Sequence, residues 1–518
     1  MLWGARRCGG QGGLMVHRVG VIALGVALVS VSSGALSVET ASPAAISADS
    51  LRLQLKTVFA NARENNLAAT LDALEAIIDA PAFADLPTSE RHAALAQAAN
   101  DSQRLKRHRE AESYASRAVA LPEQNVDDWR IRLFASTAVG DAPVEVESLT
   151  TIGRRWRYEL GQLPASTILT VASDARGAQL GDVRREMLEE LFDVRWHTAD
   201  GGEPRNLWRD LSLMLLDQGK RDQAIIVATH VTDSSDIIAM RADNRYQPLL
   251  KSRDVPHDPR RAAEAEVERL TRWREQHPRS LEVVTHLLGA LMRTGQYQQA
   301  LDLVGEVTRG VEAASVGAAP YDDLDTQYGW VLNSQSTALR HMGRFEDAVA
   351  SLQRALQWTT EKKIDARISH AINLAALLCE LDRPREALPL LPADGLSPYG
   401  KMQRADVNLM IQMQLGDAAA VESTLVELRE LSRHSLATLQ RALAVAGRVD
   451  EAAALLLSRL QSPQLRADAL VELQDYATVP LTARAKEWNA QRHTLRERPE
   501  IRAVLAQVGK IERYPSIY

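Results

Sequence analysis

The sequence predicts an all-α protein in which helical hairpins stack on one another along the chain to form a solenoid. The stretch 332–358, LNSQSTALRHMGRFEDAVASLQRALQW, has the pattern of two short antiparallel helices, and weaker copies recur on both sides of it. The composition agrees with this pattern. Hydrophobic residues make up 45% of the chain and aromatic residues only 5%, and no long alternation of Val, Ile and Thr predicts a sheet.

The clearest hairpin shows why these residues form helices. Gly343 can end the first helix in a left-handed conformation that is sterically costly for other residues, and Phe345 follows the turn. Apolar residues recur at helical spacing on both sides of this turn. In the first helix they are Leu332, Ala338, Leu339 and Met342, and in the second they are Ala348, Leu352, Ala355 and Leu356.

The second half of this hairpin resembles a tetratricopeptide repeat. The residues that carry the resemblance are Gly343, Arg344, Phe345, Glu346, Asp347, Ala348 and Ala355, with Ser336 as the small residue of the first helix. The resemblance, to repeat proteins of the bacterial exported type, implies a right-handed α-solenoid that binds protein or peptide segments. In this family the first helix of each hairpin lines a concave groove.

Weaker copies of the hairpin place a turn residue at similar intervals. These turn residues are Gly219, Gly295, Asp382, Gly416 and Gly447, and small residues follow them at Ala224, Ala300, Ala387 and Ala452. Gly416 lies 34 residues after Asp382, and Gly447 lies 31 residues after Gly416, close to the ~34 residues of this repeat. The wider gap between Gly295 and Gly343 predicts an inserted loop within 310–328. Further copies are predicted at 59–78 and at 94–121, where Ala111 and Ala118 are the small residues.

The N-terminal residues have the pattern of an export signal. Basic residues precede the apolar run Val19–Val31, and Ser33, Gly34 and Ala35 offer a cleavage site, with Met1 or Met15 as the true start. The predicted location is therefore periplasmic or secreted. The alternative is an uncleaved inner-membrane anchor at 19–38, and the membrane enters the prediction only through this segment.

The sequence predicts five parts. They are a signal peptide at 1–35, a degenerate helical segment at 36–231, a break with a capping role at 232–261, a solenoid at 262–475 and capping helices at 476–518. Cys379 is the one cysteine outside the leader, and its apolar helix predicts a buried thiol. The formal net charge of −6 works against a nucleic-acid partner.

Motifs for chemistry are scarce in this chain. The sequence contains no HExxH motif, CxxC pair, GxSxG elbow or phosphate-binding loop, so we predict no catalytic residue, cofactor or metal. Two histidines, His341 and His370, are expected to be packed or exposed residues, although neighbouring hairpins could bring them together. The loop 195–206 mixes Trp196, His197, Asp200 and Glu203, and its Gly-Gly and Pro favour an exposed turn.

The predicted function is that of a non-catalytic scaffold of the cell envelope or periplasm, which binds a protein or peptide segment. Counting back from the turn glycines selects the candidate groove residues Trp330, Asn333, Thr337, Arg340, His341 and Arg293. Here the arginines would bind a carboxylate, with Trp330 as an apolar platform. Thr337 stands where the carboxylate-clamp subgroup of the family has Asn. The alternative is an exported enzyme, or an accessory of polysaccharide export, with its site in 154–206.

Overall fold

The computed structural model describes residues 47–61, 66–314, 319–477 and 479–514. These residues form 27 α-helices, four short 3-10 helices and one pair of two-residue strands, so the predicted all-α fold of helical hairpins is confirmed. No helix in these ranges is long and apolar enough to cross a membrane. The predicted leader at 1–35 and the alternative anchor at 19–38 lie outside the described residues. Two compact units are present, and the division falls between Trp196 and His197.

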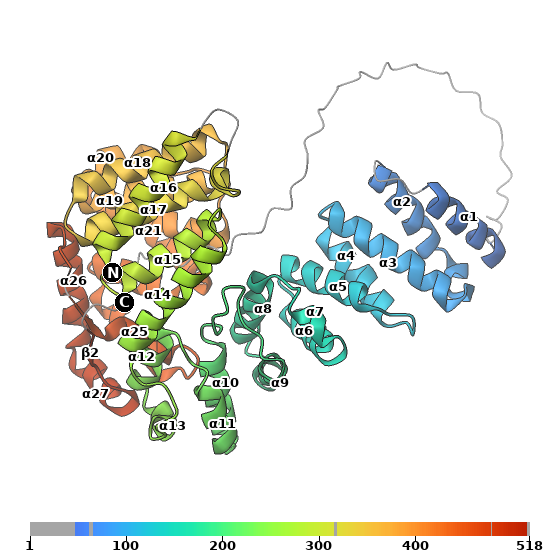
Figure 1. Cartoon of the computed structure of the whole chain (residues 1–518), viewed down its shortest axis with the longest axis horizontal. Coiled ribbons are helices and arrows are strands. Elements are labelled where there is room, and N and C mark those ends of the chain that lie inside the picture. The colour runs from blue at the N-terminus through green and yellow to red at the C-terminus, as the bar shows by residue number, and fades with distance from the viewer. Residues whose placement is uncertain (1–46, 62–65, 315–318, 478, 515–518) are drawn as a thin grey trace. The chain divides into compact units, whose positions relative to one another are not determined.

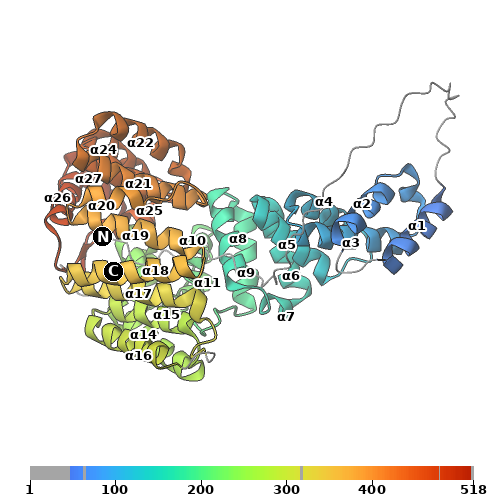
Figure 2. The same ribbon diagram turned by 90° about the horizontal axis from the view of Figure 1, so that it is seen from above.

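The N-terminal unit is a stack of hairpins in chain order (Figure 1, Figure 2). Its elements are α1 (Ala48–Asn61), α2 (Leu67–Ile78), η2 (Pro81–Asp85), α3 (Thr88–Arg104), α4 (His108–Val119), α5 (Val126–Val139), α6 (Ala142–Arg155), α7 (Arg157–Leu160), α8 (Ala165–Gly177) and α9 (Gly181–Asp193). Both copies predicted in this part are hairpins, formed by α1 with α2 and by α3 with α4. Ala111 and Ala118 are fully buried, which lets α4 approach its neighbours closely.

The C-terminal unit contains all the remaining helices, including those of the clearest hairpin. Its helices are α10 (Leu207–Asp217), α11 (Arg221–Ala228), α12 (Ser234–Ala242), η3 (Asn244–Tyr246), α13 (Gln247–Leu250), α14 (Pro259–Gln276), α15 (Leu281–Arg293), α16 (Tyr297–Ala313), α17 (Leu324–His341), α18 (Phe345–Glu361), α19 (Ala366–Glu380), α20 (Pro384–Ala387), η4 (Leu388–Leu390), α21 (Pro398–Leu415), α22 (Ala418–Glu430), η5 (Ser432–His434), α23 (Leu436–Val445), α24 (Val449–Gln461), α25 (Arg466–Leu473), α26 (Ala483–Arg496) and α27 (Pro499–Val508). The strands are β1 (Asp475–Tyr476) and β2 (Arg513–Tyr514), which pair in parallel.

The predicted turn residues all have the left-handed backbone. Gly219, Gly295, Gly343, Gly416 and Gly447 have φ between 74° and 77°, and Asp382 has φ 57°. Each of the small residues predicted to follow them, Ala224, Ala300, Ala348, Ala387 and Ala452, is no more than 1% exposed. The local rule that predicted the hairpins therefore holds throughout this unit. Between α16 and α17, where an inserted loop was predicted, the helices end at Ala313 and resume at Leu324.

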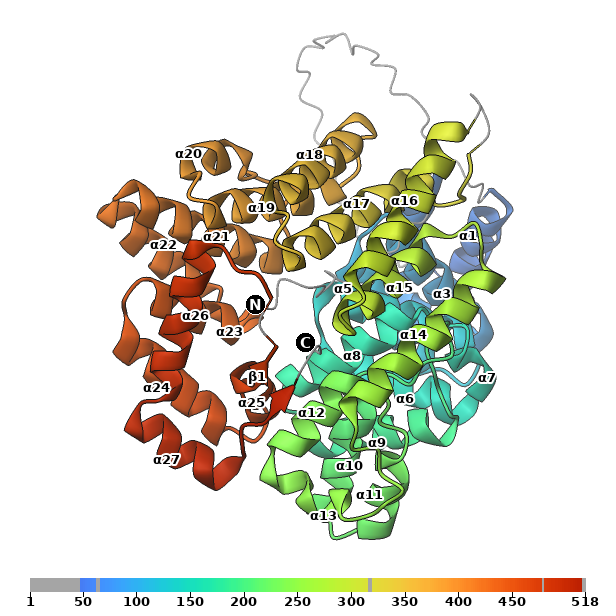
Figure 3. The same ribbon diagram turned by 60° about the vertical axis from the view of Figure 1, so that its left-hand side comes forward.

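The hairpins of the C-terminal unit curve until its last elements meet its first (Figure 3). In this view α19, α21, α23 and α25 lie on the inner side, and α18, α20, α22 and α24 lie outside them. The ring closes where α12 contacts α25 and η3 contacts α27. Three bonds between residues more than 260 positions apart secure this closure. The Lys510 amide donates to the Ala242 carbonyl at 2.9 Å, Asn244 Nδ2 donates to the Gln507 carbonyl at 3.0 Å, and Arg241 Nε pairs with Glu512 at 2.7 Å.

The segment 232–261, predicted as a break, lies inside the C-terminal unit and supplies one side of this closure. Ile237, Ile238 and Met240 of α12 are each no more than 1% exposed, because α14 and α25 both pack on this helix. The predicted division at 232–261 and the observed division after Trp196 therefore differ. A break was predicted because this segment holds prolines and turn residues, but those residues form the short η3 and α13 around a buried helix.

The C-terminal helices also do more than cover the last repeat. The segment 479–496 crosses the turns of several hairpins, and we call it the strap. Pro480 lies beside Gly343, Arg484 pairs with Asp382 at 2.5 Å, and Trp488 packs against the core shared by α17, α19, α21 and α23. At its far end Arg492 and Arg496 donate to the carbonyls of Glu472 and Leu473, at the C-terminus of α25, where cations are favoured.

Candidate functional site

Five of the six predicted groove residues lie along α17 and are half-buried. Asn333 Oδ1 accepts a hydrogen bond from Asn373 Nδ2 of α19 at 2.9 Å, and Thr337 donates to the Asn333 carbonyl at 3.3 Å. Arg340 Nη2 donates to both carboxylate oxygens of Glu380, at 2.9 and 2.8 Å. Asn333 and Arg340 therefore join neighbouring helices, and the Arg340 guanidinium already holds a carboxylate of its own chain.

Arg293 is engaged in the same way as Arg340. Its Nη2 lies 2.6 Å from Glu266 of α14, and each of these side chains is less than a fifth exposed. His341, at the end of α17, stacks on Tyr297 with ring centroids 5.0 Å apart. Burial, with the adjacent Arg340, lowers the pKa of His341 to about 4, so the ring is neutral at physiological pH. The structure thus uses these predicted groove residues to connect hairpins.

His341 and His370 are not brought together. His370 packs edge-on against Trp330, at a centroid distance of 4.7 Å, and Trp330 lies about three helical turns before His341 on α17. His370 is fully buried, and neither ring nitrogen has a hydrogen-bond partner among the described residues. Burial lowers its pKa to about 4. In the described parts of the chain, no three His, Cys, Asp or Glu side chains are placed to hold a metal ion.

The loop 195–206 is part of the region 154–206 that was predicted as the alternative site, and contacts of Asp200 and Glu203 hold it in place. Asp200 pairs with Arg269 of α14, and Glu203 accepts from Trp208 Nε1 at 2.6 Å and from His230 Nδ1 at 2.9 Å. His197 is exposed, and its Nδ1 contacts the Thr198 carbonyl at 2.9 Å. Trp196 is 6% exposed at the end of the N-terminal unit. Asp200 and Glu203 therefore anchor the loop to α14 and α10. Cys379 is fully buried as predicted, and burial raises its pKa to about 12.

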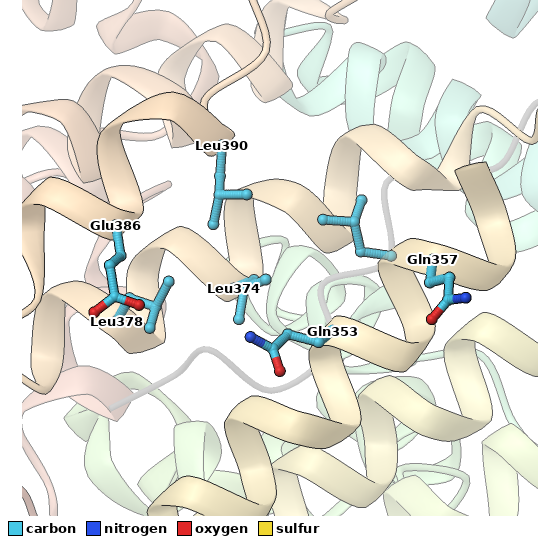
Figure 4. Close-up of a pocket in the computed structure, with 7 residues that line it drawn as sticks. Gln353, Gln357, Leu374, Leu378, Glu386 and Leu390 are labelled. Atoms are coloured by element: carbon cyan, nitrogen blue, oxygen red, sulfur yellow. The ribbon is translucent and has the colours of Figure 1, made fainter. Parts of the chain in front are cut away.

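A groove of about 330 Å³ lies between α18, α19 and α20, on the outer side of the ring (Figure 4). We call it the α18–α20 groove. Its apolar lining consists of Leu356, Leu374, Leu378 and Leu390, and its polar lining consists of Gln353, Gln357 and Glu386. Glu386 is the one charged residue of this lining, and it is bound by Arg383 at 2.7 Å.

A second groove, of about 350 Å³, lies on the other side of α18, and we call it the α16–α18 groove. Its apolar residues include Leu301 of α16 and Leu339 of α17. Arg354 of α18, which also lines it, is exposed and forms no ion pair with another described residue. In both grooves the floor comes from the first helix of a hairpin and the walls come from second helices. The two grooves are thus the same feature in successive hairpins, with α18 as their shared wall.

The α18–α20 groove differs from the α16–α18 groove in that one of its walls is a short second helix. In the neighbouring hairpins α16 and α18 have 17 residues each and α22 has 13, whereas α20 has four and η4 has three. Pro389 and Pro392 stand where a longer helix would continue, and each lacks the amide proton that an α-helix needs. These two prolines are the feature of the sequence from which the short second helix could have been predicted. The groove was not predicted, because the candidate groove residues all came from the first helix of each hairpin.

No protein-family model matches this chain, and no curated protein matches it. Several solved structures resemble it at low identity. One is a Rap protein complexed with competence and sporulation factor, at 10% identity over 79% of this chain and 100% of that chain, with a TM-score of 0.33. The Cut9–Hcn1 hetero-tetramer of APC/C matches at 12% identity over 89% of this chain and 96% of that chain, with a TM-score of 0.23. Yeast Tom70 matches at 11% identity over 81% of this chain and 100% of that chain, with a TM-score of 0.22. The architecture of this chain therefore rests on its own hairpins.

Proposed function

We propose that this protein is a non-catalytic scaffold that binds a helical segment of a partner protein in the α18–α20 groove. The observation that carries the proposal is the short α20. In a stack of hairpins the surface of each first helix is covered by second helices. Beside the short α20 a groove remains above the buried Leu374 and Leu378 of α19, and its partly exposed apolar residues are Leu356 and Leu390. An amphipathic helix has the shape and the apolar face to complete it. Since Glu386 is the charged residue of the lining, a basic residue on that helix is favoured.

The inner-face residues remain a second prediction for the same function. Because Arg293 and Arg340 hold Glu266 and Glu380, reversing either arginine alone would break a contact between helices. The exchange Arg340→Glu/Glu380→Arg keeps an ion pair and inverts the charge offered at each position. An exported location, with the partner in the cell envelope, stays a prediction from the N-terminal sequence.

The groove can be tested with peptides selected for binding from a displayed library of helical sequences. The variant Gln353→Arg/Gln357→Arg adds bulk and charge at two exposed positions of the groove, and we expect it to weaken binding roughly tenfold or more. The matched control is Gln218→Arg/Gln223→Arg, an equal charge change at exposed positions beside and within α11. Selected peptides that bind the groove variant as tightly as the wild type would contradict the proposal.

A further inference from the structure

The N-terminal unit presents a basic and aromatic tip where α6 ends and α7 begins. We call residues 155–158, Arg-Trp-Arg-Tyr, the Arg-Tyr tip. Tyr158 is 79% exposed, the largest fraction for any large hydrophobic side chain among the described residues. Arg155 and Arg157 are exposed, and Trp156 is half-buried. Tyr, Trp and Arg are the residue types that most often dominate the binding energy at protein interfaces, and here they are gathered in one place.

The Arg155 side chain is fixed in place by neutral groups. Its guanidinium carbon lies 4.7 Å from the centre of the Trp156 ring, and its Nη1 donates to Gln124 Oε1 at 2.7 Å. Gln124 Oε1 also accepts from Trp129 Nε1 at 2.8 Å, and Trp129 is 7% exposed. The guanidinium is therefore held by two uncharged side chains, Gln124 and Trp156, which do not neutralise it. A partner that binds it would lose little side-chain entropy in doing so.

Three carboxylates of this region are engaged with other arginines. Arg154 pairs with Glu190 at 3.1 Å and Glu186 at 3.2 Å, both on α9, and Glu159 pairs with Arg130 at 3.4 Å. Neither Arg155 nor Arg157 forms an ion pair with any residue that the structure describes. Arg154 thus stabilises the fold, while the two arginines of the tip keep their charge available.

We propose that the Arg-Tyr tip is a docking surface for an acidic segment of a partner protein. Carboxylates of that segment bind Arg155 and Arg157, where a planar guanidinium can hold both oxygens of one carboxylate. An apolar side chain between those carboxylates packs on the Tyr158 ring. The net charge of −6 does not prevent this, because exposed charges more than about 8 Å away are screened at physiological ionic strength. This surface is separate from the α18–α20 groove and does not depend on it.

An array of synthetic peptides in which Glu alternates with apolar residues tests the tip on the full chain. We expect binding that weakens with salt, is absent when Lys replaces Glu, and falls roughly tenfold or more in Arg155→Glu/Arg157→Glu. Tyr158→Ala removes a side chain that is mostly in solvent, so the fold is retained, and binding should still weaken severalfold. The control Arg385→Glu/Arg502→Glu makes the same charge change at two exposed positions of the C-terminal unit.

Three results would overturn the proposal. The first is that no acidic peptide of the array binds the wild-type chain. The second is an equal loss of binding in the control variant, which would show that only net charge matters. The third is that phosphatidylglycerol vesicles or single-stranded DNA bind through Arg155 and Arg157 more tightly than every acidic peptide, which would assign the tip to a different class of partner.

Discussion

At the scale of single residues, Glu145 of α6 has an unusual environment. It is fully buried, and neither of its carboxylate oxygens has a hydrogen-bond partner among the described residues. Burial, together with the nearby Asp174 and Asp141, raises its pKa from 4.5 to about 8. The folded chain therefore keeps this group protonated at neutral pH, whereas the unfolded chain ionises it.

This difference predicts how the stability of the N-terminal unit depends on pH. The folded state binds the proton more tightly, so the stability from this group is complete below pH 4.5 and is lost as the pH rises to about 8. Glu145→Gln stays neutral throughout, so at pH 8 we expect it to unfold with a free energy about 1–3 kcal/mol larger than the wild type. Chemical denaturation, monitored by hydrogen exchange of amides in the N-terminal unit, measures this difference in the free energy of unfolding.

A control for that prediction is Glu147→Gln on the same helix. Glu147 is 58% exposed and pairs with Arg132 at 2.8 Å, so its substitution should not stabilise the unit at pH 8. If Glu145→Gln gave no more stability at pH 8 than at pH 4, Glu145 would have to be ionised in the folded state.

At the scale of elements, Asp382 shows how the strap affects a turn. Every other turn residue predicted in this unit is Gly, but Asp382 has the same left-handed backbone, which costs a residue with a Cβ about 1–2 kcal/mol. Its Oδ1 accepts from Arg484 Nε at 3.0 Å and Nη2 at 2.5 Å. The ion pair with Arg484 of the strap needs a carboxylate, which explains why this turn residue is Asp and the others are Gly.

A double-mutant cycle separates these two effects. We expect Asp382→Gly to change the free energy of unfolding little in the wild-type chain, because relief of strain offsets the lost ion pair. In an Arg484→Ala background the ion pair is already absent, so the same substitution should stabilise by about 1 kcal/mol. Equal effects of Asp382→Gly in both backgrounds would show that the strap does not depend on this contact.

The elements were predictable from sequence to the extent that their determinants are local. Gly343 and Ala348 specify a turn and a close approach within a few residues of themselves, and the structure confirms both. The pairing of Arg340 with Glu380 was not predicted, since helical spacing says nothing about the neighbouring hairpin. A signal for it was present, because Arg340 and Glu380 precede their turn residues by nearly the same number of positions.

At the scale of the whole C-terminal unit, closure of the ring depends on a close approach at Gly509. A Cβ on this residue would lie 2.3 Å from the Ala242 carbonyl oxygen and 2.9 Å from Leu470. The Gly509 backbone is extended, a conformation that any residue can adopt, so a side chain is excluded here only by the lack of space. No pattern in the sequence predicts this contact, because its two sides lie more than 260 residues apart and in different predicted parts of the chain.

We therefore expect Gly509→Ala to destabilise the C-terminal unit by about 1–3 kcal/mol. Hydrogen exchange should show faster exchange of the Lys510 amide, which donates to Ala242. The control Gly289→Ala adds a Cβ within α15 that meets only the end of the Arg293 side chain, at 3.6 Å, and it should stabilise the helix by up to about 1 kcal/mol. Unchanged protection of Lys510 in Gly509→Ala would mean that closure tolerates the methyl group.

Ring closure also changes how the C-terminal unit can come apart. An open array of repeats frays from its two ends, because a terminal repeat has only one neighbour to leave. From α12 to α25 every hairpin has a neighbour on both sides, so the first one to detach must break two interfaces at once. This part of the chain should consequently melt as one cooperative block, with similar protection around the whole circle.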